Sequence, residues 1–258
     1  MNTGLAMSGG GVRGLAHVGI IKALREHGII INHFSGVSAG ALVAAMAAAD
    51  AGIDDMLDFW TETDPFSLRH FAFGKPAIFH SLDYVDPLRN IIKHDTFESL
   101  PHRLTVWVTA MLSGKLRSFD SGPLWPIVVA SACFPLVFSP VSWEGEMYMD
   151  GGIIDNFPVE PLADSCDFII GVNVDPHRSI PQEDLKSMRD IVERVMDLRF
   201  KGDAEEKARK CDVIIYPPRI DLYRTFDTGA MLEIFQLGYE AGVNAIPEIK
   251  AKIAEKSP

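Results

Sequence analysis

The sequence predicts an α/β fold of three layers, in which helices cover both faces of a mostly parallel central sheet. Short apolar segments of strand length alternate along the chain with segments of helical periodicity. At two places a strand passes into a helix through a glycine-rich turn. The chain has 258 residues, 47% of them hydrophobic and 23% charged. This composition fits one globular domain over residues 1–258, with a C-terminal helical region at 183–258 packed on the sheet.

Two strand–turn–helix units open the chain. Residues 5–7 form a short apolar run, residues 9–14 are rich in glycine, and residues 15–27 place apolar side chains at helical spacing. The same order repeats at residues 29–34, 36–40 and 41–49, the last of which is rich in alanine, the strongest helix former. The repetition favours neighbouring strands of one sheet.

The rest of the chain continues the alternation of strands and helices. Strands are expected at residues 104–112, 116–119, 147–149, 168–174 and 213–216. Helices are expected at residues 123–133, 183–210 and 229–242, with shorter helical pieces within 53–100. The helix at 183–210 is amphipathic, and because its polar face carries both signs of charge we expect its apolar face to cover the sheet rather than a membrane. Aromatic residues between 64 and 80 fit either a packed core or a lipid-facing rim.

Charge and cysteine content exclude several classes of partner. The chain has 24 basic and 35 acidic side chains, a net charge of −11, so its field repels nucleic acid and gives no general attraction to anionic membranes. Any lipid contact must therefore be apolar and local. Three widely spaced cysteines without a CxxC pair indicate reduced thiols. Without a secretory signal or a membrane-length apolar segment, we expect a cytoplasmic protein that contacts membrane surfaces transiently; no pattern indicates its oligomeric state.

A serine lies at the centre of the second glycine turn. The pentapeptide Gly36-Val37-Ser38-Ala39-Gly40 stands between a predicted strand and a predicted helix, which is the context of a nucleophile elbow. The glycines relieve crowding in a tight turn that projects the serine hydroxyl outward. The same pentapeptide also fits a serine that merely caps a helix.

The first glycine turn offers backbone donors for an oxyanion. Consecutive N–H groups at a glycine turn that opens a helix can hold a developing negative charge, helped by the helix dipole. Gly9, Gly10 and Gly11 fit this role, and the N–H of Ala39 is a second source. The alternative is a nucleotide- or phosphate-binding module at residues 9–14, since Gly-x-Gly-x-x-Gly also matches a dinucleotide fingerprint. That fingerprint requires an acidic residue after the second strand, and residues 32–35 contain none.

An aspartate follows a later apolar strand. Asp150 precedes Gly151 and Gly152, whose lack of side chains would let its carboxylate approach another loop closely. Taken alone, these residues are better explained by a simple Asp-Gly turn.

Taken together, these segments resemble the patatin-like phospholipase family from Leu5 to about Val174. The glycine turn at 9–14, the elbow at 36–40 and Asp-Gly-Gly at 150–152 occur in the order and spacing of that family. Residues 131–135 and 155–158 are similar to segments that the family carries around its site. The joint match is far more specific than any one of its parts.

The resemblance implies a lipid acyl hydrolase of the phospholipase A or lysophospholipase type. Ser38 would attack the acyl carbonyl, Asp150 would be the only base, and water would release the fatty acid from an acyl-enzyme, with no metal or organic cofactor. We therefore expect a direct hydrogen bond between Asp150 and Ser38, in a site dry enough to raise the carboxyl pKa. Residues expected to support this site are Arg13, Gly14, Gly36, Gly40, Gly151, Gly152 and Asn156.

A conventional triad remains an alternative. Ser38, Asp150 and His177 stand in the Ser-Asp-His order of ordinary α/β-hydrolases, and His177 follows a predicted strand. The resemblance instead gives the base role to Asp150 directly, and His17 is expected to be structural.

Overall fold

An eight-stranded sheet organises the computed structural model, which describes residues 1–63, 85–135, 138–175, 179–225 and 228–256. Five strands are parallel, in the order β3, β2, β1, β7, β8, and span Arg103–Ala110, His33–Val37, Thr3–Met7, Phe168–Val172 and Val213–Ile215. Three antiparallel strands extend the β3 side: β4 (Lys115–Phe119), β5 (Val141–Trp143) and β6 (Glu146–Asp150). The sheet is therefore mixed and mostly parallel, which confirms the predicted fold class.

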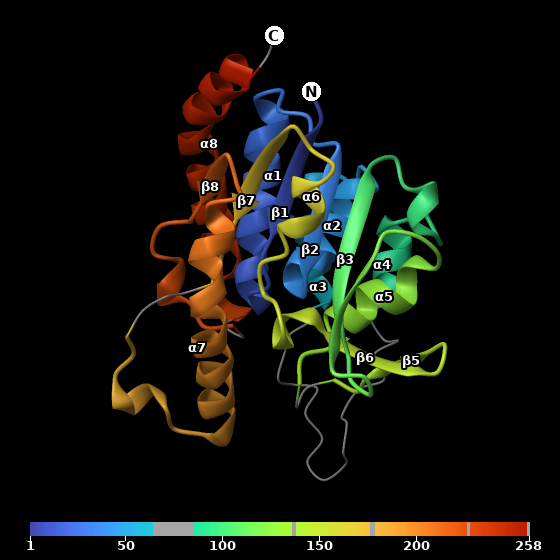
Figure 1. Cartoon of the computed structure of the whole chain (residues 1–258). Helices are drawn as coiled ribbons and strands as arrows, with labels where there is room; N and C mark the ends of the chain where they lie inside the picture. The colour runs from blue at the N-terminus through green and yellow to red at the C-terminus, as the bar shows by residue number, and fades with distance from the viewer. Residues whose placement is uncertain (64–84, 136–137, 176–178, 226–227, 257–258) are drawn as a thin grey trace.

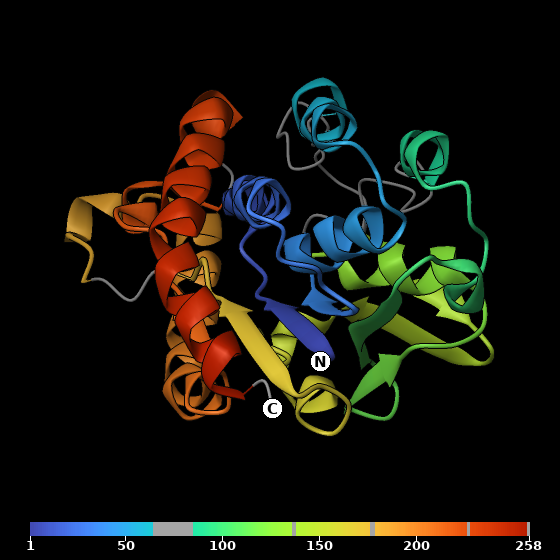
Figure 2. The same cartoon turned by 90° about the horizontal axis from the view of Figure 1, so that it is seen from above.

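Most helices cover one face of this sheet (Figures 1 and 2). These are α1 (Leu15–Glu26), α2 (Ala39–Ala48), α3 (Ile53–Thr63), α4 (Val85–Ile91) and α5 (Leu124–Ser131). Every residue of α2 is buried, because its small alanine side chains let it lie directly against β2 with other helices around it. The long helix α8 (Met231–Lys256) packs along α1 and reaches the β8 edge.

The opposite face carries α6 (Glu160–Ala163) and α7 (Met188–Ala208). The short helix α6 lies over β1 and β2, where Leu162 is buried in a small core with Ala6 and Phe157. The two helices are joined by Lys207 of α7, which pairs with Glu160 at the start of α6. Helices on both faces agree with the three-layer prediction.

Some predicted boundaries differ from the structure, and two short elements were not predicted. The strand expected from residue 29 begins at His33, because Ile29 donates its N–H to Leu24 in the end of α1 and Ile30 is exposed. The final helix continues to Lys256, well beyond the expected end at residue 242, because Ile246 and Ile249 remain buried on its inner face. Strand β5 and helix α6 were not predicted, since each is too short for a periodic pattern.

For the N-terminal half of α7, the prediction that the apolar face of this amphipathic helix covers the sheet is wrong. Its apolar side chains Met188, Ile191, Val195 and Leu198 are exposed, by between 44% and 72%. The aromatic stretch at 64–80 lies outside the described residues. Within the described chain, no helix combines the length and apolar character needed to cross a bilayer.

Candidate active site

The turn between β2 and α2 holds Ser38 in a conformation that few residues adopt. Its φ and ψ are 54° and −127°, and its side chain is buried. A positive φ in a non-glycine residue carries a conformational cost, so surrounding contacts must hold the turn. One contact is with Ser131, whose hydroxyl accepts a 2.9 Å hydrogen bond from the Ser38 N–H and donates one of 2.7 Å to the carbonyl of Trp107. Ser131 thus fixes the turn that holds Ser38 to β3.

Close backbone packing explains the glycine at position 40. A Cβ there would lie 2.5 Å from the carbonyl oxygen of Met7 and 2.6 Å from that of Ser8. The start of α2 therefore touches the end of β1 directly, which brings the two predicted glycine turns side by side. Gly36, which would meet the Gly40 carbonyl at 2.5 Å, belongs to the same tight packing.

Asp150 reaches the same place from the antiparallel side of the sheet. In the strand register Val37 lies opposite Trp107, and Asp150 lies opposite the next residue of β3, Val108. Ser38 and Asp150 are therefore level with each other across β3. The Ser38 hydroxyl is close enough to the Asp150 carboxyl to act as a donor that lowers its pKa.

The Asp150 carboxyl is buried, and its environment favours the protonated form. Desolvation raises its pKa to about 7, against the opposing effects of the hydrogen bonds from Ser38 and from the Gly152 N–H, the latter 2.8 Å long. The adjacent Gly151 lies against β3, where a Cβ would meet the Trp107 carbonyl at 2.5 Å. A carboxylate that titrates near neutral pH is a better proton acceptor for a hydroxyl than an ordinary aspartate.

The glycine loop and the start of α2 carry backbone N–H groups that no other residue of the described chain uses. Among the residues that the structure describes, the N–H groups of Gly10, Gly11 and Ala39 have no protein acceptor. Gly9 differs from the expectation, because its N–H already donates to the Asn156 carbonyl at 3.2 Å. Its lack of a side chain serves another purpose: a Cβ would lie 2.3 Å from Asn156 Oδ1 and 3.1 Å from Ser38 Cβ. Gly9 thus lets the loop pass next to Ser38.

Buried polar contacts hold this glycine loop in place. Arg13 is buried, and its guanidinium donates to the Gly10 carbonyl at 3.2 Å and to the Thr225 hydroxyl at 3.1 Å. Asp175 Oδ1 lies 3.8 Å from Arg13 Nη2, and its other oxygen accepts a 3.0 Å hydrogen bond from Asn156. Burial raises the pKa of Asp175 to about 6, although Arg13 and Asn156 oppose this change. Through these contacts Arg13 and Asn156 tie the glycine loop to Asp175 and to Thr225.

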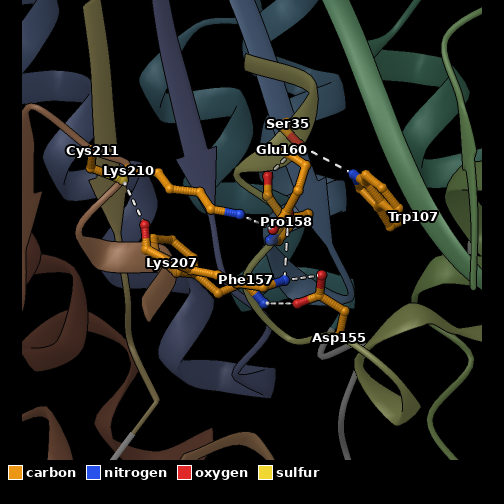
Figure 3. Close-up of polar contacts among 9 residues, drawn as sticks. All are labelled: Ser35, Trp107, Asp155, Phe157, Pro158, Glu160, Lys207, Lys210 and Cys211. Atoms are coloured by element: carbon orange, nitrogen blue, oxygen red, sulfur yellow. Dashed lines mark hydrogen bonds and ion pairs between the residues drawn. The ribbon is translucent and has the colours of Figure 1, made fainter. Parts of the chain in front are cut away.

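The segment that carries Asn156 is itself tied to the sheet and to α7 (Figure 3). Ser35 on β2 donates a 2.7 Å hydrogen bond to the Pro158 carbonyl and accepts one of 3.3 Å from the indole of Trp107. Asp155 accepts from the Phe157 N–H at 2.9 Å and pairs with Lys207. These contacts hold in place the segment that follows Asp150 and carries Asn156.

Two residues around the site could not be identified from the sequence. Asp175 and Thr225 belong to no local motif, and they reach the site only through the strand order and the packing of the C-terminal segment. Ser131 opens the segment 131–135 that the resemblance puts near the site, but its contact with the Ser38 N–H depends on the fold. Histidine 17 is buried beneath the loop, with Nε2 at 2.9 Å from the Ser8 carbonyl, and burial lowers its pKa to about 4. It is neutral and structural. His177 lies outside the described residues.

Comparison with known proteins places the chain in a family. A family model for patatin-like phospholipases matches residues 5–163, a segment that contains both Ser38 and Asp150. An uncharacterised NTE family protein of Mycobacterium tuberculosis is 34% identical over 185 residues, which cover 70% of this chain and 51% of that protein. The lysophospholipase NTE1 of Coccidioides immitis is 28% identical over 285 residues, or 96% of this chain and 18% of that protein. This chain thus spans about half, or less, of the length of these relatives.

A solved structure supports the fold alone. VipD from Legionella pneumophila aligns over 96% of this chain and 67% of its own, with a TM-score of 0.59 and 17% sequence identity. The family model covers more than half of the chain, and the mycobacterial relative exceeds 30% identity over more than two thirds of it. The chain therefore belongs to the patatin-like phospholipase family, a family of serine lipid hydrolases.

Proposed function

We propose that this protein hydrolyses fatty-acyl esters of phospholipids or lysophospholipids through a Ser38–Asp150 dyad. The observation that carries the proposal is a buried Asp150 carboxyl level with a serine on a strained turn, where burial raises the carboxyl pKa to about 7. A serine becomes a useful nucleophile when an adjacent base within hydrogen-bond reach accepts its proton. The lysophospholipase name of a relative that matches 96% of this chain supports lipid as the substrate class.

The chemistry follows in two steps. In the first, Asp150 accepts the proton of Ser38 while Oγ bonds to the acyl carbon, and the N–H groups of Gly10, Gly11 and Ala39 are proposed to hold the oxyanion. The ester C–O bond then breaks, and the departing alcohol takes the proton from Asp150. In the second, Asp150 accepts a proton from water, which attacks the acyl carbon of the acyl-enzyme. The bond to Ser38 Oγ then breaks, Oγ takes the proton from Asp150, and the fatty acid is released. Each step leaves Asp150 ready for the next.

A covalent probe tests this proposal. Mass spectrometry after treatment with a fluorophosphonate should show a single adduct on Ser38, with none on a Ser38→Ala variant. Hydrolysis of p-nitrophenyl acyl esters should be lost in Ser38→Ala and Asp150→Asn. It should persist in a control variant at an exposed serine, Ser118→Ala.

Two outcomes would contradict the dyad. Loss of activity in His177→Ala, with Asp150 left intact, would favour a conventional triad that uses His177. Neither an adduct nor turnover in the wild-type protein would remove the hydrolase proposal itself.

A further inference from the structure

One face of α7 presents an apolar stripe to solvent. The stripe consists of Met188, Ile191, Val195 and Leu198, spaced by three or four residues and therefore on one side of the helix. Their exposed fractions are 72%, 44%, 58% and 54%. Contiguous exposed apolar side chains of this kind mark a surface that meets a partner.

The body of the protein holds α7 by its C-terminal end. Ala204 is buried, and Lys207 pairs with Asp155 and with Glu160, the latter at 3.4 Å (Figure 3). The helix has 21 residues, which corresponds to about 32 Å, whereas a five-residue strand such as β7 spans about 17 Å. Its N-terminal half, which carries the stripe, therefore extends beyond the end of the sheet, as Figure 1 shows.

This end of the sheet is the end that holds Ser38. The parallel strands β1, β2, β3, β7 and β8 share one carboxyl edge, and Ser38 follows β2 there. Helix α7 starts after the carboxyl end of β7 and returns to the amino end of β8, so its N-terminus lies at the same edge. The β3–β4 turn at this edge adds exposed Met111 and Leu112. At the opposite edge, Ile30 is exposed beside the start of β2.

Size and charge decide which partner fits the stripe. From Met188 to Leu198 the stripe is about 15 Å long. Its four side chains offer much less surface than the roughly 800 Å² per partner that a stable protein dimer buries. Basic and acidic residues are nearly balanced along α7, and the net charge of the chain is −11. An anionic surface would therefore repel the protein, whereas a surface without net charge would accept the apolar stripe.

We propose that the apolar stripe of α7 docks the protein on lipid aggregates that carry no net charge, such as phosphatidylcholine vesicles. Docking there brings the lipid surface to the edge of the sheet that holds Ser38. This inference rests on the proposed function for its biological meaning, but the binding itself does not require catalysis.

Vesicle binding and hydrolysis of a soluble ester separate docking from chemistry. We would combine Met188→Gln, Ile191→Gln and Val195→Gln, since glutamine keeps the helix while it removes the apolar surface. Ile30→Gln is the matched control, as an exposed isoleucine at the far edge. Co-sedimentation with phosphatidylcholine vesicles should weaken about tenfold or more in the triple variant and remain unchanged in the control.

The catalytic readouts distinguish the two proposals. Vesicle lipid hydrolysis should fall with binding in the triple variant, while kcat/KM for a water-soluble p-nitrophenyl ester stays at the wild-type value. Ser38→Ala should bind vesicles like the wild type. If no ester is hydrolysed but the stripe still governs vesicle binding, the proposed function fails and the docking inference stands.

Three results would overturn the docking inference. One is a triple variant that binds phosphatidylcholine vesicles as well as the wild type. Another is a protein that binds only to vesicles containing phosphatidylglycerol and loses this binding in salt, which would indicate electrostatic attraction. The third is a wild-type dimer that light scattering shows to become monomeric in the triple variant, which would assign the stripe to a second copy of the chain.

Discussion

Replacing Asp150 by asparagine should stabilise the folded protein at neutral pH while it removes the proposed base. Burial raises the carboxyl pKa from 3.8 to about 7 in the folded state, so the folded protein holds this proton more tightly than the unfolded chain. Stability therefore falls as pH rises through this window and is not recovered above it. The full effect of about three pKa units is about 4 kcal/mol. An amide cannot ionise and escapes this cost.

Chemical denaturation of both proteins at about pH 5 and about pH 8 measures this effect. The two units between about pH 5 and the folded pKa of about 7 correspond to about 3 kcal/mol. The free energy of unfolding of Asp150→Asn, relative to wild type, should rise by that amount between the two pH values. Other titrating groups are common to both proteins and cancel. Asp120→Asn, at an exposed aspartate, should show no such rise. A difference that stays constant within about 1 kcal/mol would refute the elevated pKa of Asp150.

Three further predictions concern the same site. With a water-soluble ester, kcat/KM should increase with pH around a midpoint near 7, because only ionised Asp150 accepts the proton; a flat pH–rate profile would contradict this. Ser131→Ala leaves the buried Ser38 N–H unpaired, so the free energy of unfolding should fall by about 1–3 kcal/mol and kcat should be lower. Wild-type values in denaturation and in steady-state assays would exclude the positioning role. Asp175→Asn removes the buried charge that faces Arg13, so the free energy of unfolding should fall by about 3–5 kcal/mol and fluorophosphonate should label Ser38 more weakly. A stable, fully labelled variant would disprove that Asp175 helps to hold the glycine loop.

Exposed positions supply the controls for these variants. Ser118→Ala and Asp120→Asn change the same residue types on the surface of the described structure. Each should alter the free energy of unfolding by no more than about 0.5 kcal/mol. Larger effects would mean that the buried variants report general sensitivity rather than the contacts described.

Local patterns in the sequence were sufficient for the sheet class and for the two turns of the proposed site. Periodicity depends only on neighbouring residues, so the strand–turn–helix units at the start of the chain are visible without a structure. The glycines at 36 and 40 follow from backbone contacts within one tight turn and with the adjoining strand. Ser38 and Asp150 could be paired because the order and spacing of three motifs resembled one family.

Only the tertiary structure decided which backbone groups are available and what the outer helix does. The N–H of Gly9 is used by the carbonyl of Asn156, a contact between segments almost 150 residues apart that no local pattern encodes. The amphipathic pattern of α7 shows which side of the helix is apolar, but not what that side contacts. Periodicity locates an apolar face, whereas the packing of the whole chain determines whether that face meets the sheet or, as here, solvent at the edge that holds Ser38.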